Sequence, residues 1–423
     1  MRGCRQLLPV GSLFFAFCGP NATRYGNADQ LGRDRPESVV SARAVPLANG
    51  EPAPHDGVWK RLIEKKAGTA MTTESDNIVA ATAARIFADL ADPQTINKAR
   101  DDAWKEKLWQ ALADAGLTLA WVPEKMGGAG GGLGDGFAIV AAAGRYALPV
   151  PLAETLLAGW LLAQAGIESP AGTMTVAPAS PSGGVALNSD GTVSGTVRGI
   201  PFAKNAKHIA VFASAGKGTT VALVKTADCR VSPGQNLAGD GSDSVTFERT
   251  KPVVGAPAPF GVTAPMQMGA AVRSLQIAGA LETLLAMSVA YANERVAFER
   301  KIGKFQAVQQ NLARLACEAA AALAAAGSAA DTITHADGFD DTVLLEAASA
   351  KIRAGEAAAE GSAIAHQVFG AIGFTNEHVL HRFTLRLLAW RDDFGSESQW
   401  AATLGGMIAA QGANQFWPML AAR

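Results

Sequence analysis

Four cations stand close together in the chain, on both sides of Gly303. They are Arg295, Arg300, Lys301 and Lys304. Apolar residues recur at helical spacing before this group and again after it, which predicts two long helices joined by a short basic turn. Cations between a helix end and a helix start suit an anion, although a solvated turn between two core helices would have the same composition.

The elements that must position these cations follow from the same spacing. We expect one helix over residues 265–300, closed by Arg295 and Phe298, and a second over residues 305–332. The Ala-rich run inside the second helix indicates a closely packed helix face, because Ala has the highest helix propensity and lets helices approach. The basic turn should therefore lie at one end of a helical bundle.

The pattern Arg-x-x-Phe-x-x-x-Ile-x-x-Phe-Gln, from Arg295 to Gln306, resembles the flavin-binding segment of the acyl-CoA dehydrogenase family. A later stretch that starts at Gln367, Gln-Val-Phe-Gly-Ala-Ile-Gly-Phe-Thr-Asn-Glu-His, is similar to a second motif of that family. The resemblance extends over residues 77 to 421. It implies an FAD-dependent dehydrogenase of an acyl-CoA thioester, in fatty acid or steroid side-chain catabolism, with electron-transfer flavoprotein as the electron acceptor.

The resemblance also implies which residues contact FAD, with the cofactor bound across a subunit interface and Gln367 contributed by a second subunit. These residues are Arg295, Phe298, Ile302, Phe305, Gln306, Gln367 and Gly370. The fork of the Arg295 guanidinium is suited to pyrophosphate. The sequence departs from the family at Glu299, usually Gly, which puts a carboxylate beside the expected pyrophosphate.

Dehydrogenation of a thioester requires a base for the α-proton, donors for the enolate-like charge and an oxidised flavin for the hydride. The family's base is a Glu in one of two places. Register puts Phe394 or Gly395 at the C-terminal place and Gly269 at the other, and none of these takes a proton. Asp393 and Glu397 flank the first place, either as the catalytic group of a rebuilt loop or as solvated charges.

An arginine near the same helix start meets the thioester end of coenzyme A in the family. Register puts Ala270 there, so Arg273, about one turn further on, is the substrate-binding candidate, with a surface arginine as the alternative. The missing base favours a non-catalytic subunit whose paralogous partner supplies the Glu. A homo-oligomeric enzyme with a rebuilt loop and a flavin-free structural relative remain as alternatives.

Composition limits the other function classes. The 423 residues are 48% hydrophobic and carry a net charge of −1, so a nucleic-acid partner is not expected. The four cysteines have no CxxC spacing, and we predict neither a disulfide framework nor a metal site. No apolar run reaches the roughly 18 residues of a membrane span. We expect a cytoplasmic enzyme, although residues 7–18 have the outline of a signal or transit segment.

We predict an α+β, mostly α, fold with three parts. Residues 1–70 form an irregular extension outside the fold, and residues 77–170 a helical domain. Residues 171–256 have strand-like runs separated by Gly, Asn, Asp and Pro, which predicts a small antiparallel β domain. That domain lacks the family's Trp-x-x-Ser/Thr wall over the flavin, where this chain has Gly199-Ile-Pro-Phe. Residues 260–423 should form a C-terminal domain resembling a four-helix bundle.

Overall fold

The computed structural model describes residues 78–177, 184–216 and 218–421, so the expected extension at 1–70 lies outside the described residues. The first part is helical: α2 (Ile78–Leu90), α3 (Pro93–Asn97), α4 (Ala103–Asp114), α5 (Leu133–Arg145) and α6 (Leu152–Gln164). All except α3 fall close to ranges that the apolar period predicts. The short α3 begins at Pro93 behind the Asp92 side-chain cap, and five residues are too few to show a period.

The middle part is an eight-stranded sheet in the order β6-β7-β3-β2-β4-β5-β8, with β1 beside β4. Its strands are β1 (Met174–Ala177), β2 (Val185–Leu187), β3 (Val193–Pro201), β4 (His208–Ala215), β5 (Gly218–Lys225), β6 (Arg230–Ser232), β7 (Ser242–Thr250) and β8 (Val254–Pro257). The prediction of a wholly antiparallel sheet is wrong, because β1 and β2 both pair parallel to β4. The chain reverses its direction between β2 and β3 and reverses again before β4. After two reversals β4 therefore runs in the same direction as β2.

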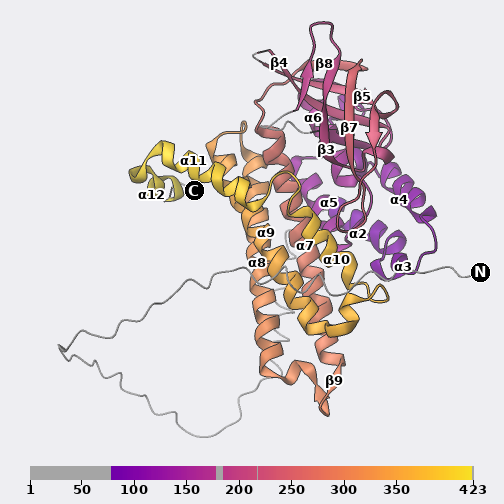
Figure 1. Ribbon diagram of the computed structural model, residues 1–423, viewed down its shortest axis with the longest axis vertical. Helices are drawn as coiled ribbons and strands as arrows, with labels where there is room; N and C mark the ends of the chain where they lie inside the picture. The colour runs from indigo at the N-terminus through magenta and orange to yellow at the C-terminus, as the bar shows by residue number, and fades with distance from the viewer. Residues whose placement is uncertain (1–77, 178–183, 217, 422–423) are drawn as a thin grey trace, which may run out of the picture. The chain divides into compact units, whose positions relative to one another are not determined.

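The last part is helical again, as the sequence predicts. Figure 1 shows the long helices of this part side by side, with the sheet near one end, and an arm formed by the C-terminal helices. The helices are α7 (Ala264–Glu294), α8 (Gln306–His335), α9 (Asp341–Phe369), α10 (Leu380–Trp390), α11 (Glu397–Gln411) and α12 (Ala413–Ala421). Both α7 and α8 have the length and composition of a membrane span, a test that core helices also pass, and 56% of the α7 window is buried.

The basic turn differs from its prediction. Helix α7 ends at Glu294, so the segment from Arg295 to Arg300 is not helical. It forms a hairpin of β9 (Val296–Ala297) and β10 (Arg300–Lys301), with Phe298 at φ 52° and Glu299 at φ 64° in its turn. Two successive residues at positive φ are the geometry of a tight two-residue hairpin, which a helical pattern cannot contain.

Close backbone contact fixes α5 against α7. A Cβ atom added at Gly144 would lie 2.3 Å from the Gln276 carbonyl oxygen, and one added at Gly279 would lie 2.3 Å from the Ala141 oxygen. Both glycines therefore allow an approach that any side chain would prevent. The face of α7 that continues toward α6 and the C-terminal loop holds the candidate active site.

Candidate active site

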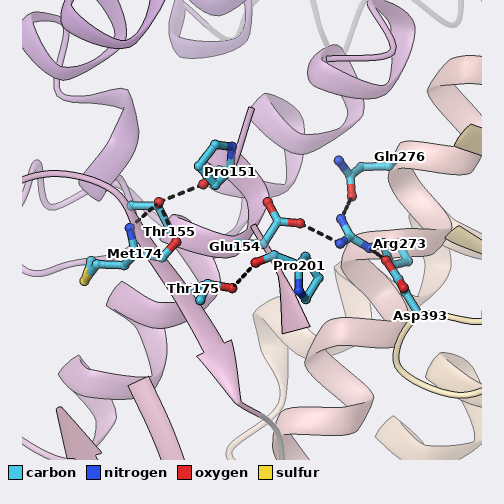
Figure 2. A network of polar contacts seen from close by, with 9 residues as sticks. All are labelled: Pro151, Glu154, Thr155, Met174, Thr175, Pro201, Arg273, Gln276 and Asp393. Atoms are coloured by element: carbon cyan, nitrogen blue, oxygen red, sulfur yellow. Dashed lines mark hydrogen bonds and ion pairs between the residues drawn. The ribbon is translucent and has the colours of Figure 1, made fainter. Parts of the chain in front are cut away.

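The centre of the junction between the three parts is Arg273 on α7, which is only 2% exposed. Figure 2 shows its guanidinium directed at acceptors from three elements. It donates from Nη2 to Glu154 Oε1 at 2.5 Å, from Nε to Asp393 Oδ2 at 2.9 Å, and from Nη1 to Gln276. The alternative of a surface arginine is therefore wrong. Arg273 ties α7 to α6 and to the loop between α10 and α11.

Glu154, the partner of Arg273 on α6, is as deeply buried as Arg273 itself. The Glu154 side chain is 2% exposed. Burial alone would lower the pKa of Arg273, but the charges of Glu154 and Asp393 outweigh burial, and the pKa is raised. One turn of α6 is fastened to the sheet, because Thr155 Oγ1 donates to the Met174 carbonyl at 3.0 Å. The ion pair of Arg273 and Glu154 is thus a fixed, charged link between α7 and α6.

The two places of the family's base lie against each other in the structure. A Cβ atom added at Gly269 would lie 2.2 Å from Cδ1 of Phe394, so the phenyl ring occupies the space beside α7. Gly395 has φ 99°, and a Cβ atom there would lie 2.6 Å from Trp400 Nε1. Phe394, and not Gly395, therefore directs its side chain toward Gly269. None of these three positions holds a carboxylate.

Buried donors fasten the loop that carries Phe394. Lys351 on α9 has no exposed surface, and its Nζ donates to the Gly395 carbonyl at 2.7 Å and to the Arg391 carbonyl. Trp400 Nε1 donates to the Phe394 carbonyl at 2.9 Å. Burial lowers the pKa of Lys351 to about 8 although three acidic side chains oppose the shift. Hydrogen bonds to a charged group are worth roughly 1.5–3 kcal/mol each, so the loop is strongly held.

Asp393 and Glu397, the candidate bases, are both engaged by cations. Asp393 Oδ2 accepts from Arg273, and its side chain is 23% exposed. Glu397 Oε1 accepts from Arg391 Nε at 2.7 Å. Burial tends to raise the pKa of Glu397, but the hydrogen bond from Arg391 and further favourable contacts lower it overall. A carboxylate with a lowered pKa is a weak base, so Glu397 does not resemble an activated catalytic group. The Asp393 carboxylate is already engaged by the Arg273 guanidinium.

The space at this junction is small. A cavity of about 10 Å³ lies beside Arg273 and Asp393, which is room for roughly one water molecule. Its wall includes the turn after β3, where Phe202 has φ 53°. An acyl thioester does not fit in this space.

The residues expected to contact the adenosine and pyrophosphate of FAD lie at another place, the free end of the bundle. Tyr291 near the end of α7 stacks on Phe369 at the end of α9, with ring centroids 4.3 Å apart. This contact brings the hairpin and the segment from Gln367 to Gly370 to the same end of one chain. The two motifs therefore lie at the same end of one chain, and the contribution of Gln367 from a second subunit stays a prediction.

The chemistry of this end fits an anion. Arg295 and Gln306 are exposed, and Gln306 is the first residue of α8, whose N-terminus has no side-chain cap. A helix N-terminus with nearby guanidinium groups is suited to pyrophosphate. Gly370 has φ 64° and open space around its Cα, which allows a ligand to approach the backbone. The basic end of the bundle thus fits the anionic part of FAD.

The apolar candidates line the same hairpin. Phe298 is 89% exposed, whereas Ile302 and Phe305 are half-buried. The guanidinium carbon of Arg300 lies 4.0 Å from the centroid of the Phe305 ring. Glu299 shares the turn with Phe298, and the conflict between its carboxylate and a bound pyrophosphate stays a prediction.

Sequence reasoning missed Glu154 and Lys351. Both side chains are buried. Glu154 is the one charged residue of the apolar helix α6, and a buried charge requires a partner, so this single charge was an available signal. Lys351 lies among several other charged residues on α9, so no such signal marked it. The identity of the partner could not be read from spacing, because Arg273 pairs with a residue 119 positions away.

Comparison with known proteins identifies the family to which the chain belongs. Residues 73–170 match the N-terminal domain of acyl-CoA dehydrogenases, and residues 262–396 match the C-terminal domain. Acyl-CoA dehydrogenase IpdE2 of Mycobacterium tuberculosis is 30% identical over 74% of this chain and 91% of its own length.

Two solved structures share the fold. One, described as a Tcur3481-Tcur3483 steroid ACAD variant, has a TM-score of 0.71 and 26% identity, and the match covers 82% of this chain and 99% of that one. The other, the ChsE4-ChsE5 complex from Mycobacterium tuberculosis, has a TM-score of 0.70 and 23% identity, over 78% and 96%. Because both domain models and a relative of nearly full length match, the chain belongs to the acyl-CoA dehydrogenase family, a class of FAD-dependent oxidoreductases.

Proposed function

We propose that this chain is the base-lacking subunit of a heteromeric acyl-CoA dehydrogenase, in which a paralogous chain supplies the catalytic Glu. The observation that carries the proposal is the phenyl ring of Phe394 beside Gly269, where the family has a carboxylate. Both carboxylates near this position are held in ion pairs with arginines. The ChsE4-ChsE5 neighbour is a complex of two named components, which supports a heteromeric assembly.

In this assembly the present chain binds and orients FAD. Arg295, Arg300 and the N-terminus of α8 would hold the pyrophosphate of FAD at the bundle end. FAD, when bound, accepts the hydride from the β-carbon of the acyl-CoA substrate. Gln367 and Gly370 would border the same ligand. We propose a cytoplasmic location and electron-transfer flavoprotein as the electron acceptor, in line with the family.

The deciding experiment compares the purified chain with the same chain coexpressed with its paralogue. General-base catalysis typically contributes about 100-fold to 10,000-fold, so the isolated chain should be nearly inactive and coexpression should restore turnover. Absorbance in the flavin region reports the cofactor in both samples. Arg295→Ala in the assembly should lose most of its flavin, whereas Arg230→Ala, an exposed arginine on the sheet, serves as the control.

The competing function is a self-sufficient dehydrogenase with a rebuilt loop, and Asp393 favours it because its side chain borders the junction cavity. Turnover by the isolated chain that disappears in Asp393→Asn would establish that function and overturn our proposal. Turnover that survives both Asp393→Asn and Glu397→Gln would place the base elsewhere in the chain.

A further inference from the structure

We propose that a cavity between α6, the start of α7 and the link from α8 to α9 binds a flat, uncharged ring compound with one polar end. The cavity has a volume of about 400 Å³, whereas a buried water needs only about 10–15 Å³. Small-molecule sites measure roughly 300–1,000 Å³. The proposal goes beyond the proposed function, because the described residues that line this cavity include neither Phe394 nor any residue of the basic hairpin.

Three aromatic side chains form one wall of the cavity: Trp160 on α6, Phe260 before α7 and Phe339 before α9. The rings of Trp160 and Phe260 are parallel within 2°, with centroids 5.4 Å apart. The Phe339 ring meets both of them edge-on, at 5.6 Å from Trp160 and 6.0 Å from Phe260. Aromatic rings favour further rings in offset-stacked or edge-to-face contact. This wall therefore favours a flat ring body over a flexible chain.

Contacts behind the wall hold it in place. The Phe212 ring on β4 continues the stack behind Phe260, with centroids 6.0 Å apart. The Thr219 hydroxyl donates to the Phe260 carbonyl at 3.0 Å. In the link from α8 to α9, the Asp340 carboxylate accepts from two backbone amides at the start of α9. Walls that are already fixed lower the ordering cost of binding, so the cavity suits a ligand that fits without rearrangement.

The charge around the cavity decides which ring compounds it accepts. Asp337 is exposed and lines the cavity just beyond the C-terminus of α8, and none of the described lining residues is basic. The N-terminus of α7 also lies at the cavity, and its dipole offsets the opposite dipole of the α8 C-terminus. The Asp337 charge remains and repels an anion. The cavity therefore disfavours acyl-CoA and other phosphate-bearing ligands.

Polar side chains lie at the opening of the cavity and apolar ones further inside. Trp160 and Val343 are 3% and 1% exposed, whereas Gln164 and Thr263 are exposed. An apolar ring body can thus occupy the inner part while a hydroxyl group bonds the Gln164 amide or the Thr263 hydroxyl. A few polar groups beside a mostly apolar wall are typical of a small-molecule site.

Isothermal titration calorimetry of the full chain with 2-naphthol and 2-naphthoate at neutral pH tests the proposal. The two probes share a flat two-ring body and differ in the polar end, which is a hydroxyl group or a carboxylate. 2-Naphthol should bind saturably at one molecule per chain, and 2-naphthoate should bind at least about tenfold more weakly. No saturable binding of 2-naphthol, or equal affinity for the two probes, would overturn the proposal.

A charge variant tests whether Asp337 sets this selectivity. Asp337→Lys should raise the affinity for 2-naphthoate about tenfold and change that for 2-naphthol less than about twofold, because only the anion responds to the charge. Asp331→Lys is the matched control, since Asp331 is an exposed carboxylate of α8 that does not line the cavity. It should behave as the wild type. Unchanged 2-naphthoate affinity in Asp337→Lys would overturn the proposal.

A filling variant tests whether the probe enters the cavity. Ala336 is half-buried and lines it, so Ala336→Phe should place a ring in the space and abolish 2-naphthol binding. Ala325→Phe, at another half-buried alanine that does not line the cavity, should retain binding. Retained binding in a folded Ala336→Phe protein would overturn the proposal. If Ala336→Phe does not fold, the exposed Asp337→Lys substitution decides alone.

Discussion

At the scale of single residues, the two possible places of the missing base are not equivalent. Phe394 has φ 54° and directs its side chain at Gly269, whereas Gly395 has φ 99° and faces the Trp400 indole. A carboxylate at position 395 would point away from α7. The position that corresponds in space to the family's base is therefore 394.

Gly395→Glu should not restore turnover and should lower stability. A side chain at positive φ costs roughly 1–2 kcal/mol, and the Cβ contact with Trp400 adds to that cost. A melting temperature lower by several degrees is expected from thermal unfolding. Gly405→Glu is the matched control, because its Cβ would meet open space on α11. Restored turnover in Gly395→Glu would mean that the loop rearranges.

Lys351 should make stability depend on pH. Burial lowers its pKa from 10.5 to about 8 in the folded chain. Between these values the unfolded chain binds the proton that the folded chain has released, so the free energy of unfolding rises with pH. The gain is roughly 1.4 kcal/mol per pH unit and is lost as pH falls through 8.

Urea denaturation at pH 8 and pH 9.5 checks this dependence. The difference in unfolding free energy between the wild type and Lys351→Met should grow by about 2 kcal/mol in favour of the wild type. Lys225→Met, on an exposed end of β5, should show no such growth. A difference that stays constant would show that Lys351 titrates normally.

At the scale of elements, the sequence predicts the long helices well and the connections poorly. Helix α9 spans the predicted range because its period is uninterrupted and Asp340 caps it. The hairpin after α7 could not be predicted, because Phe298 and Glu299 adopt positive φ without the glycine that usually marks such a turn. The parallel pairing of β1 and β2 with β4 depends on tertiary contacts that alternation does not encode.

Glu299→Gly should improve this hairpin in two ways. Glycine relieves a positive φ of 64°, worth about 1 kcal/mol, and the change removes a carboxylate beside the expected pyrophosphate. A higher melting temperature and tighter FAD binding by the assembly are expected. Glu299→Ala separates the effects, because it removes only the charge and should improve FAD binding alone. Weaker FAD binding in both variants would contradict the assigned pyrophosphate position.

At the scale of the whole molecule, buried ion pairs join the three parts. Arg273 joins α7 to Glu154 on α6, and Arg386 on α10 joins Asp240 beside β7 at 2.6 Å. Sequence spacing indicates neither pair, because the partners are far apart in the chain. The secondary structure of each part could largely be predicted from the sequence. The contacts that hold the parts together could not.

Residues 1–70 should be dispensable for folding. Their composition has no sustained apolar period, and the match to the N-terminal family domain starts at residue 73. A chain that starts at Met71 should keep the melting temperature of the full chain and bind the same amount of flavin in the assembly. A melting temperature lower by several degrees, roughly 1 kcal/mol or more, would show that the segment packs on the fold.

The pair formed by Arg273 and Glu154 should show strong coupling across the junction. Arg273→Met leaves Glu154 buried without its cation. Removal of one partner of a buried ion pair typically lowers the free energy of unfolding by about 3–5 kcal/mol. Arg273→Met with Glu154→Leu replaces both charges by apolar groups and should recover much of that loss. The double-mutant cycle in urea compares these with Glu154→Leu alone. Additive effects would mean that the two side chains do not interact, and the link between α6 and α7 would then depend on packing alone.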